Sequence, residues 1–313
     1  MGNIRKIRLT EQQFTDIVKE TVKQYLKEDF VKSPMNYTGG KHKLLPQIVP
    51  LFPKHVNRFI DLFAGGANVA ANVVSNANKV VANDYDPRVI EIYKKMQSMP
   101  TEQILSYIEN RIREYGLSKT NVEGYNRFRE DYNKNIADGR GNNPLDLFIL
   151  ICYSFNHQIR FSNKGFFNMP FGKNRSAFND SIKQNVINFR KQIENIEFQS
   201  GDYANFNIDD LTKDDFVYCD PPYLITTAAY NENNGWTETN EKQLLAFLDK
   251  LNSKGVKFAL SNVLQNRGYT NEILSNWAKK YNVHHLNFNY GNSNYHAKDK
   301  STGGTDEVLI TNY

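Results

Sequence analysis

Four consecutive residues in the second half of the chain combine groups that could do chemistry. Asp220-Pro221-Pro222-Tyr223 directly follows the apolar run 216–219, which is typical of a buried parallel strand. A carboxylate at the carboxyl end of such a strand lies where open α/β sheets bind their ligands. The two prolines lack N–H donors, so the carbonyl groups of this turn stay free to accept hydrogen bonds. Acceptors beside a flat tyrosine ring suit an exocyclic amine on a planar base, although an ordinary strand-ending turn also fits these residues.

Three further aspartates follow strand-like segments and could contribute to the same site. Asp61 precedes a turn of Phe63, Ala64, Gly65 and Gly66, whose glycines let the backbone approach a ligand and expose N–H groups. Asp84 is placed to accept both hydroxyls of a ribose. Asp202 could accept from an adenine amino group, with Tyr203 or Phe63 packing against the ring. Each aspartate alone fits an ordinary loop residue or helix cap, but together with Asp220 they predict one ligand site.

The elements that must position these residues alternate between strand and helix. Apolar runs predict strands at 58–63, 79–82, 216–219 and 257–262, and helices from Gly66 through Val74, at 87–96 and at about 238–252. The runs 283–290 and 307–311 are close enough to pair as an antiparallel hairpin, and residues 290–304 are typical of a surface loop. This alternation predicts an α/β fold with a doubly wound, mostly parallel sheet.

Two segments depart from the alternation. Residues 101–187 form a mainly helical insertion, and within it the stretch 160–171 alternates around Asn163-Lys164-Gly165, which predicts a β-hairpin. The expected domains are therefore 34–100 with 188–313 as one unit and 101–187 as the other. Residues 1–33 stand apart, with an amphipathic helix predicted from about Thr10 to Glu28 that either packs on its own domain or docks a partner.

Composition limits the function without naming it. The 313 residues are 40% hydrophobic and 23% charged, and they contain neither a membrane-length apolar run nor a signal-peptide core. The two cysteines offer no disulfide framework and no metal cluster, which favours a cytoplasmic protein without a metal. A net charge of +5 permits nucleic-acid binding but does not demonstrate it.

Five ordered motifs resemble a known family. Asn36-Tyr37-Thr38-Gly39-Gly40-Lys41, Asp61 to Gly66, Asn83-Asp84-Tyr85, Gly201-Asp202 and Asp220 to Tyr223 occur in the order seen in Dam-like DNA adenine-N6 methyltransferases, the α-group or D12 class. The similarity covers about Met35 to Tyr313. The C-terminal third is especially similar to methyltransferases that accompany type IIS restriction enzymes.

This resemblance implies a site-specific enzyme that methylates N6 of an adenine flipped out of double-stranded DNA, using S-adenosyl-L-methionine. The insertion would be a target-recognition domain with Arg160 reading a guanine. Catalytic residues would be Asp220, Pro221, Pro222 and Tyr223; cofactor residues would be Tyr37, Lys41, Asp61, Phe63, Ala64, Gly65, Asp84, Asp202, Tyr203 and Asp220; DNA-binding residues would be Asn156, Gln158, Arg160, Lys164, Pro170, Lys173 and Asn174.

The same resemblance carries expectations about partners and target. We expect a monomer in a bacterial or phage-infected cell, away from membranes and accompanied by a restriction endonuclease acting on the same site. His157-Gln158 and Asn174 differ from the family's usual Gly-Leu and Tyr, which places a GATC target in question. An RNA methyltransferase, a cytosine-N4 methyltransferase and a non-catalytic DNA-binding protein on the same fold stay open as alternatives, and identification of the methylated nucleoside distinguishes them.

Overall fold

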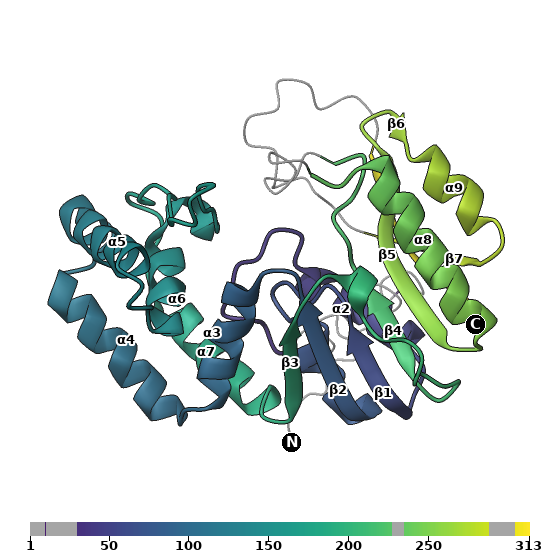
Figure 1. Cartoon of the computed structure of the whole chain (residues 1–313), viewed down its shortest axis with the longest axis horizontal. Helices are drawn as coiled ribbons and strands as arrows, with labels where there is room; N and C mark the ends of the chain where they lie inside the picture. The colour runs from purple at the N-terminus through teal and green to yellow at the C-terminus, as the bar shows by residue number, and fades with distance from the viewer. Residues whose placement is uncertain (1–9, 11–29, 227–234, 288–303) are drawn as a thin grey trace, which may run out of the picture.

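The computed structural model describes residue 10 and residues 30–226, 235–287 and 304–313 (Figure 1). The helix predicted from Thr10 to Glu28 and nearly all of the loop predicted at 290–304 lie outside these residues. Among the described residues, no helix is long and apolar enough to cross a membrane.

A single eight-stranded sheet forms the centre of the molecule. Its strand order is β3-β2-β1-β4-β5-β8-β7, and β6 pairs with β5. The first five strands of this order are parallel, whereas β8 runs antiparallel to both β5 and β7. The strands are β1 (Val56–Asp61), β2 (Ala77–Asp84), β3 (Ile196–Ser200), β4 (Phe216–Cys219), β5 (Lys257–Asn266), β6 (Tyr269–Thr270), β7 (Asn282–Leu286) and β8 (Thr305–Thr311). The expected doubly wound, mostly parallel sheet and the antiparallel tail are confirmed.

Strand β4 shows why the sheet needs covering on both faces. Phe216 and Tyr218 point into one hydrophobic core, and Val217 and Cys219 point into the other. All four side chains are buried, as expected for a central parallel strand. Helices α8 (Glu238–Ser253) and α9 (Glu272–Ala278) contribute to the second core, on the right in Figure 1.

The other face is covered by α3 (Pro87–Gln97) together with short helical segments. These are η1 (Lys41–Leu44), α2 (Leu45–Ile48), η2 (Val49–Leu51), η3 (Ala70–Asn72) and η4 (Val74–Asn76). Asp86 caps α3 by accepting the N–H of Arg88, and Pro87 occupies the first helical position, where a missing N–H costs nothing.

The insertion lies between α3 and β3, on the left of Figure 1. It comprises α4 (Thr101–Tyr115), α5 (Val122–Ala137), α6 (Pro144–Tyr153), η5 (Phe155–His157) and α7 (Asp180–Gln192), and η6 (Tyr203–Asn205) follows β3. Residues 145–153 of α6 are all buried, and they belong to the same hydrophobic core as the sheet residues Phe59 and Phe216. The insertion is therefore packed continuously with the rest of the chain, and the residue boundaries of the two domains stay a proposal.

The hairpin predicted at 160–171 forms only in part. A turn is present, with the N–H of Ser162 donating to the carbonyl of Phe166, but the segment contains isolated bridges and no regular strand. The reason lies in α5, where the Asn133 side chain bonds both the N–H and the carbonyl of Phe167. Those backbone groups are then not available to extend a ladder.

The helix predicted from Gly66 through Val74 is wrong. This stretch contains turns and the short 3₁₀ segments η3 and η4. Ala67 has a positive φ of 52°, and the side chain of Asn72 bonds both backbone groups of Val31 while that of Asn68 accepts from Ser33. The segment is thus held to residues 31–33 instead of continuing as a regular α-helix.

Candidate active site

The aspartates predicted at strand ends do converge. Asp61 is the last residue of β1, Asp84 is the last residue of β2, and Asp220 follows β4 directly. Strand β1 lies between β2 and β4, so the order of the sheet reverses at this point. Open α/β sheets bind ligands at such a switch point, outside the carboxyl ends of the strands.

Asp84 is fixed by backbone donors on both carboxylate oxygens. Its Oδ2 accepts the N–H of Gly65 at 2.7 Å, and its Oδ1 accepts the N–H of Asp86 at 2.9 Å. Burial raises the pKa of Asp84, and these hydrogen bonds oppose that rise. Tyr93 supports the same turn by donating its hydroxyl to the carbonyl of Gly65 at 2.8 Å.

The glycine turn is packed closely against Tyr37. Gly65 has a φ of +48°, and a Cβ there would lie 2.9 Å from the Tyr37 ring, so both the conformation and the contact require glycine. The neighbouring Ala64 donates its N–H to Asn83 across the strand ends. The predicted cofactor residues Tyr37, Ala64, Gly65 and Asp84 therefore lie together.

Asp61 carries a buried carboxyl oxygen without a described partner. It is buried at 1% exposure, and its Oδ1 has no hydrogen-bond partner within the part of the chain that the structure describes. Burial raises the pKa of Asp61 well above its usual value, and the neighbouring carboxylates of Asp220 and Asp84 add to the rise. An unpaired buried carboxyl oxygen is costly, so Asp61 is poised to accept a hydrogen bond from a ligand.

Asp220 lies in a compact polar network. Its Oδ1 contacts the ammonium of Lys41 at 2.8 Å and accepts the hydroxyl of Tyr223 at 3.0 Å. The Lys41 ammonium also lies 5.0 Å from the centroid of the Tyr223 ring. Burial raises the pKa of Asp220, and Lys41 opposes that rise. Lys41, predicted as a cofactor residue, is thus held against the predicted catalytic carboxylate.

A residue that the sequence did not single out completes this network. Glu307 of β8 is buried at 2% exposure, and its Oε1 lies 3.8 Å from the Lys41 ammonium and 3.2 Å from the Tyr223 hydroxyl. The available signal was a carboxylate at the start of the apolar run 308–310. An acidic residue buried in a strand needs a partner.

An aromatic cluster borders the site beyond β1. The rings of Phe63 and Tyr203 lie 5.1 Å apart, and Trp236 lies 6.0 Å and 5.9 Å from them respectively. Trp236, which the sequence reading did not select, is anchored by donating its indole N–H to the buried carboxylate of Glu241. Asp202 is exposed and caps η6 by accepting the N–H of Ala204.

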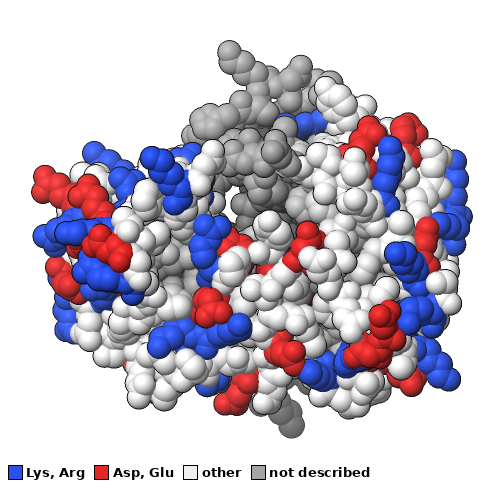
Figure 2. Space-filling view, in the orientation of Figure 1, with Lys and Arg blue, Asp and Glu red and all other residues white. Residues whose placement is uncertain are grey.

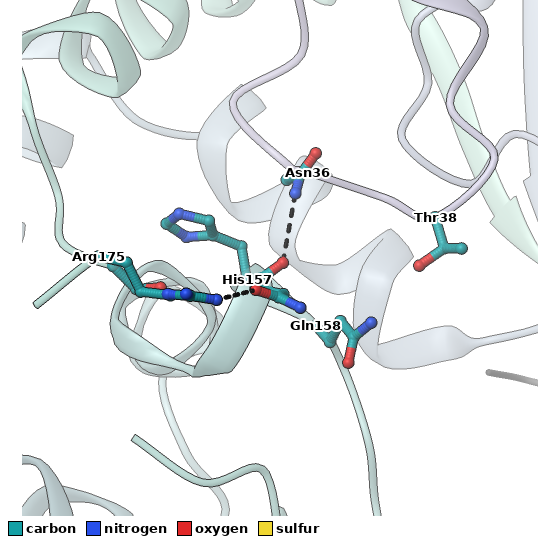
Figure 3. Close-up of a pocket in the computed structure, with 7 residues that line it drawn as sticks. Asn36, Thr38, His157, Gln158 and Arg175 are labelled. Atoms are coloured by element: carbon teal, nitrogen blue, oxygen red, sulfur yellow. Dashed lines mark hydrogen bonds between the residues drawn. The ribbon is translucent and has the colours of Figure 1, made fainter. Parts of the chain in front are cut away.

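A cleft of about 570 Å³ lies between the loop that carries Asn36 and Thr38 and the insertion (Figure 3). Asn36 donates to the carbonyl of Asn156 across it, and Arg175 contacts the side chain of Asn156 at 3.4 Å. Two predicted DNA-binding residues contribute to its lining, which consists of Asn36, Thr38, Asn156, His157, Gln158, Arg175 and Ser176. Burial lowers the pKa of His157, so this polar cleft holds a neutral imidazole near pH 7.

The other predicted DNA-binding residues lie on the insertion but outside the lining of this cleft. The guanidinium of Arg160 is oriented by Asn168, whose side-chain and backbone oxygens accept from it at 2.9 Å and 3.0 Å. The remaining four side chains are exposed, and they are Lys164, Pro170, Lys173 and Asn174. Figure 2 shows basic side chains along the upper edge of this lobe, with acidic ones interspersed.

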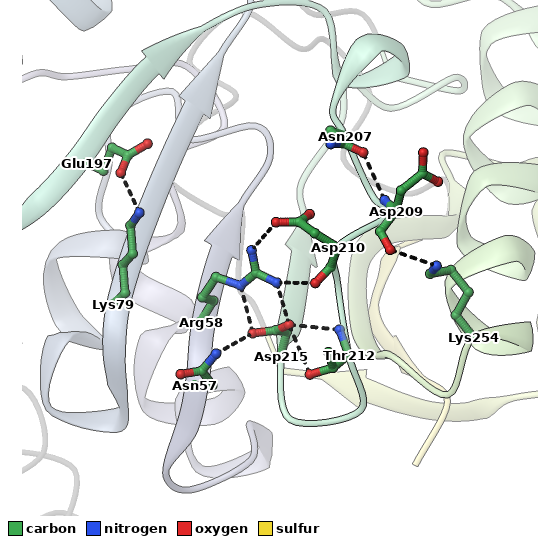
Figure 4. A network of polar contacts seen from close by, with 10 residues as sticks. All are labelled: Asn57, Arg58, Lys79, Glu197, Asn207, Asp209, Asp210, Thr212, Asp215 and Lys254. Carbon is green, nitrogen blue, oxygen red and sulfur yellow. Dashed lines mark hydrogen bonds and ion pairs between the residues drawn. The ribbon is translucent and has the colours of Figure 1, made fainter.

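A second charged cluster lies at the amino-terminal ends of β1 and β4, away from the strand-end site (Figure 4). Arg58 contacts both carboxylate oxygens of the fully buried Asp215 and also pairs with Asp210. Burial alone would raise the pKa of Asp215, but the hydrogen bonds from Arg58 and Thr212 lower it to about 2. This cluster ties two central strands together and has a structural role.

Fold and site together define an α/β protein with a cluster of carboxylates at the carboxyl ends of β1, β2 and β4. The chain belongs to the family of D12 class N6 adenine-specific DNA methyltransferases, whose model matches residues 37–291. This confirms the family predicted from the five motifs.

Relatives within this family differ in how much of their length the chain covers. It is 48% identical over 301 residues to the type II methyltransferase M.FokI of Planomicrobium okeanokoites, and 45% identical over 292 residues to the modification methylase StsI of Streptococcus sanguinis. These alignments cover 94% and 91% of this chain but 45% and 43% of the relatives, so the chain spans less than half of their length. A DNA adenine methylase of Escherichia coli K12 is 26% identical over 235 residues, covering 73% of this chain and 79% of its own.

Proposed function

We propose that this chain transfers a methyl group from S-adenosyl-L-methionine to N6 of an adenine flipped out of double-stranded DNA. One observation carries the proposal beyond family membership. Asp220 has its Oδ1 engaged by Lys41 and Tyr223, while none of the described residues bonds its Oδ2. An oriented carboxylate with one open oxygen, at the end of a central strand, suits an amino group as its hydrogen-bond donor.

The residues at the ends of β1 and β2 fit the methyl donor, which supplies an electrophilic methyl group on a sulfonium. Asp84, held by two backbone N–H groups, presents a fixed carboxylate for ribose hydroxyls. The Oδ1 of Asp61, which has no hydrogen-bond partner among the described residues, provides a buried acceptor for the amino acid portion. The ring of Tyr37 forms an aromatic wall over the glycine turn, and the Phe63–Tyr203 pair offers a surface for the adenine ring.

The catalytic residues must make a poor nucleophile react. The lone pair of an adenine amino nitrogen is delocalised into the ring. Asp220 and the carbonyl of Pro221, accepting both N6 hydrogens, favour a pyramidal nitrogen whose lone pair can attack the methyl carbon. The new N–C bond would form as the C–S bond breaks with its electrons going to sulfur. The methylated nitrogen, now positively charged, would then lose one proton to solvent along its hydrogen bond to the Asp220 carboxylate.

Tyr223 would stack against the flipped base. Its hydroxyl is held by Asp220 and Glu307, so the orientation of its ring is fixed before the base arrives. Flipping costs a few kcal/mol, and stacking on an aromatic ring returns about 1–3 kcal/mol per base. The fixed ring thus offsets much of that cost.

We assign DNA reading to the insertion. Arg160 would bind guanine O6 and N7, with Asn156, Gln158, Lys164, Pro170, Lys173 and Asn174 completing the contact surface. Support comes from the exposure of Arg160, whose guanidinium is already oriented by Asn168. The names of the relatives support a restriction-modification context, in which we expect a cognate endonuclease. We also expect the protein to be a monomer and to be cytoplasmic.

The test is to supply tritiated S-adenosyl-L-methionine together with duplex DNA, RNA or no polymer and to identify the labelled nucleoside. We expect N6-methyladenine in DNA. Asp220→Ala should abolish labelling, whereas Asp214→Ala, at the opposite end of the same strand and exposed, should retain it. Label in RNA or on cytosine, or full activity of Asp220→Ala, would refute the proposal.

A further inference from the structure

The antiparallel strand β8, which lies between β5 and the edge strand β7, carries a buried carboxylate. Glu307 pairs with Val263 of β5 and Leu286 of β7 and is 2% exposed. The residues that follow it, 308–310, are buried and apolar. A carboxylate buried at this depth is tolerated only where charged or hydrogen-bonding partners surround it.

Two of its partners are the groups that hold Asp220. Glu307 Oε1 lies 3.2 Å from the Tyr223 hydroxyl and 3.8 Å from the Lys41 ammonium. The corresponding distances to Asp220 Oδ1 are 3.0 Å and 2.8 Å. The buried carboxylate of Glu307 and the carboxylate of Asp220, whose side chain is 16% exposed, therefore share one ammonium and one phenol hydroxyl.

We propose that Glu307 is a positioning residue for methyl transfer, which competes with Asp220 for Lys41 and Tyr223 and so keeps Asp220 a strong acceptor. This inference rests on the proposed function. A phenol has a single proton to donate, and one donor of the Lys41 ammonium is directed to the carbonyl of Gly39 at 2.9 Å. With Glu307 in place, the remaining N–H donors of Lys41 and the O–H of Tyr223 are divided between the carboxylates of Glu307 and Asp220. When Glu307 carries no charge, these donors turn to Asp220, and the negative charge of Asp220 is then more fully neutralised.

The charges around Asp220 set the sign of the pH effect. Among the described residues, the titratable and charged groups that face it are Lys41, Glu307, Tyr223, Asp61, Tyr218 and Cys219. Burial is the largest cause that raises the pKa of Asp220, Lys41 lowers it, and Glu307 raises it. Removing the charge of Glu307 therefore lowers the pKa of Asp220. The acid limb of the rate profile should move to lower pH in the same variant that reacts more slowly.

The experiment compares Glu307→Gln with wild type in single-turnover methylation of DNA fragments that carry the modified site, across pH. The glutamine keeps the size of the side chain and an acceptor for Tyr223. We expect the rate constant to fall at least about tenfold, the acid limb to shift downward, and the dissociation constant for S-adenosyl-L-methionine, measured by calorimetry, to stay within about twofold. Asp306→Asn removes the neighbouring carboxylate of the same strand, which is 34% exposed and pairs with His285, and it should behave as wild type.

Each outcome bears on the inference. A Glu307→Gln enzyme with the wild-type rate and profile overturns it while leaving the proposed function intact. A variant that is slower but has an unshifted rate–pH profile also overturns the inference. So does a variant whose cofactor affinity and melting temperature fall in proportion to its rate, because Glu307 would then have a merely structural role. A wild-type protein that labels no DNA overturns the proposed function, and this inference with it.

Discussion

The buried pair of Arg58 and Asp215 makes a quantitative prediction about acid stability. Asp215 is fully buried, and its pKa in the folded protein is about 2 instead of the usual 3.8. At about 1.36 kcal/mol per pKa unit, this difference stabilises the fold by about 2.5 kcal/mol at pH 7. Because the folded pKa is depressed, the contribution is complete well above pH 3.8, falls to about half near pH 3 and is lost below pH 2.

The perturbation is Asp215→Asn, and the assay is urea unfolding followed by circular dichroism between pH 7 and pH 3. We expect a loss of about 2–3 kcal/mol at pH 7, and a gap between variant and wild type that narrows as pH falls below about 4. The matched control is Asp210→Asn, which removes the 62% exposed partner of the same arginine. An exposed ion pair contributes only about 0–1 kcal/mol.

Two results would refute this reasoning. One is a deficit of Asp215→Asn that is the same at pH 3 as at pH 7, which would mean that packing and not the charge is responsible. The other is equal destabilisation by the Asp215 and Asp210 variants, which would mean that burial does not strengthen the pair.

Three further predictions concern the ligand sites. Gly65→Ala adds a Cβ 2.9 Å from the Tyr37 ring at a φ of +48°, so we expect calorimetry to show cofactor affinity weakened at least about tenfold, and unchanged affinity would contradict the role of the turn. Tyr93→Phe removes the hydrogen bond to the Gly65 carbonyl, which should cost about 1 kcal/mol in urea unfolding; a variant as stable as wild type would show that bond to be dispensable. Arg160→Ala should lose about 1–3 kcal/mol of discrimination at one base pair in methylation-sensitive sequencing, and an unchanged site preference would exclude this arginine as the guanine reader.

Local pattern was sufficient for most strands, although β3 and β6 were not predicted, and for three of the four strand-end aspartates. Parallel strands place their carboxyl ends at one edge of the sheet, so Asp61, Asp84 and Asp220 could be grouped from the sequence. The network around Asp220 could not be predicted in this way. Lys41 and Glu307 are 266 positions apart in sequence, and only the antiparallel insertion of β8 beside β5 brings them within 3.8 Å.

The incorrect predictions also have a common physical cause. Asn68 and Asn133 each use a side-chain amide to bond backbone of a distant segment, which diverts the local chain from a regular helix or strand. Periodicity reports which residues are apolar, but it contains no information about such long-range partners. Trp236 was missed for the same reason, since the rings of Phe63 and Tyr203 that it packs against lie far from it in sequence.

Under the proposed function, in which the insertion reads DNA, the shared core of α6 and the sheet would limit how this protein acquires a new DNA specificity. Residues 145–153 are buried with the sheet side chains. An insertion exchanged from a relative would therefore have to pack against this core as well as recognise the new DNA target. The exposed positions Arg160, Lys164 and Asn174 carry no such constraint. Divergence of target preference should therefore proceed by single substitutions in surface loops, with the buried helices inherited as part of the catalytic unit.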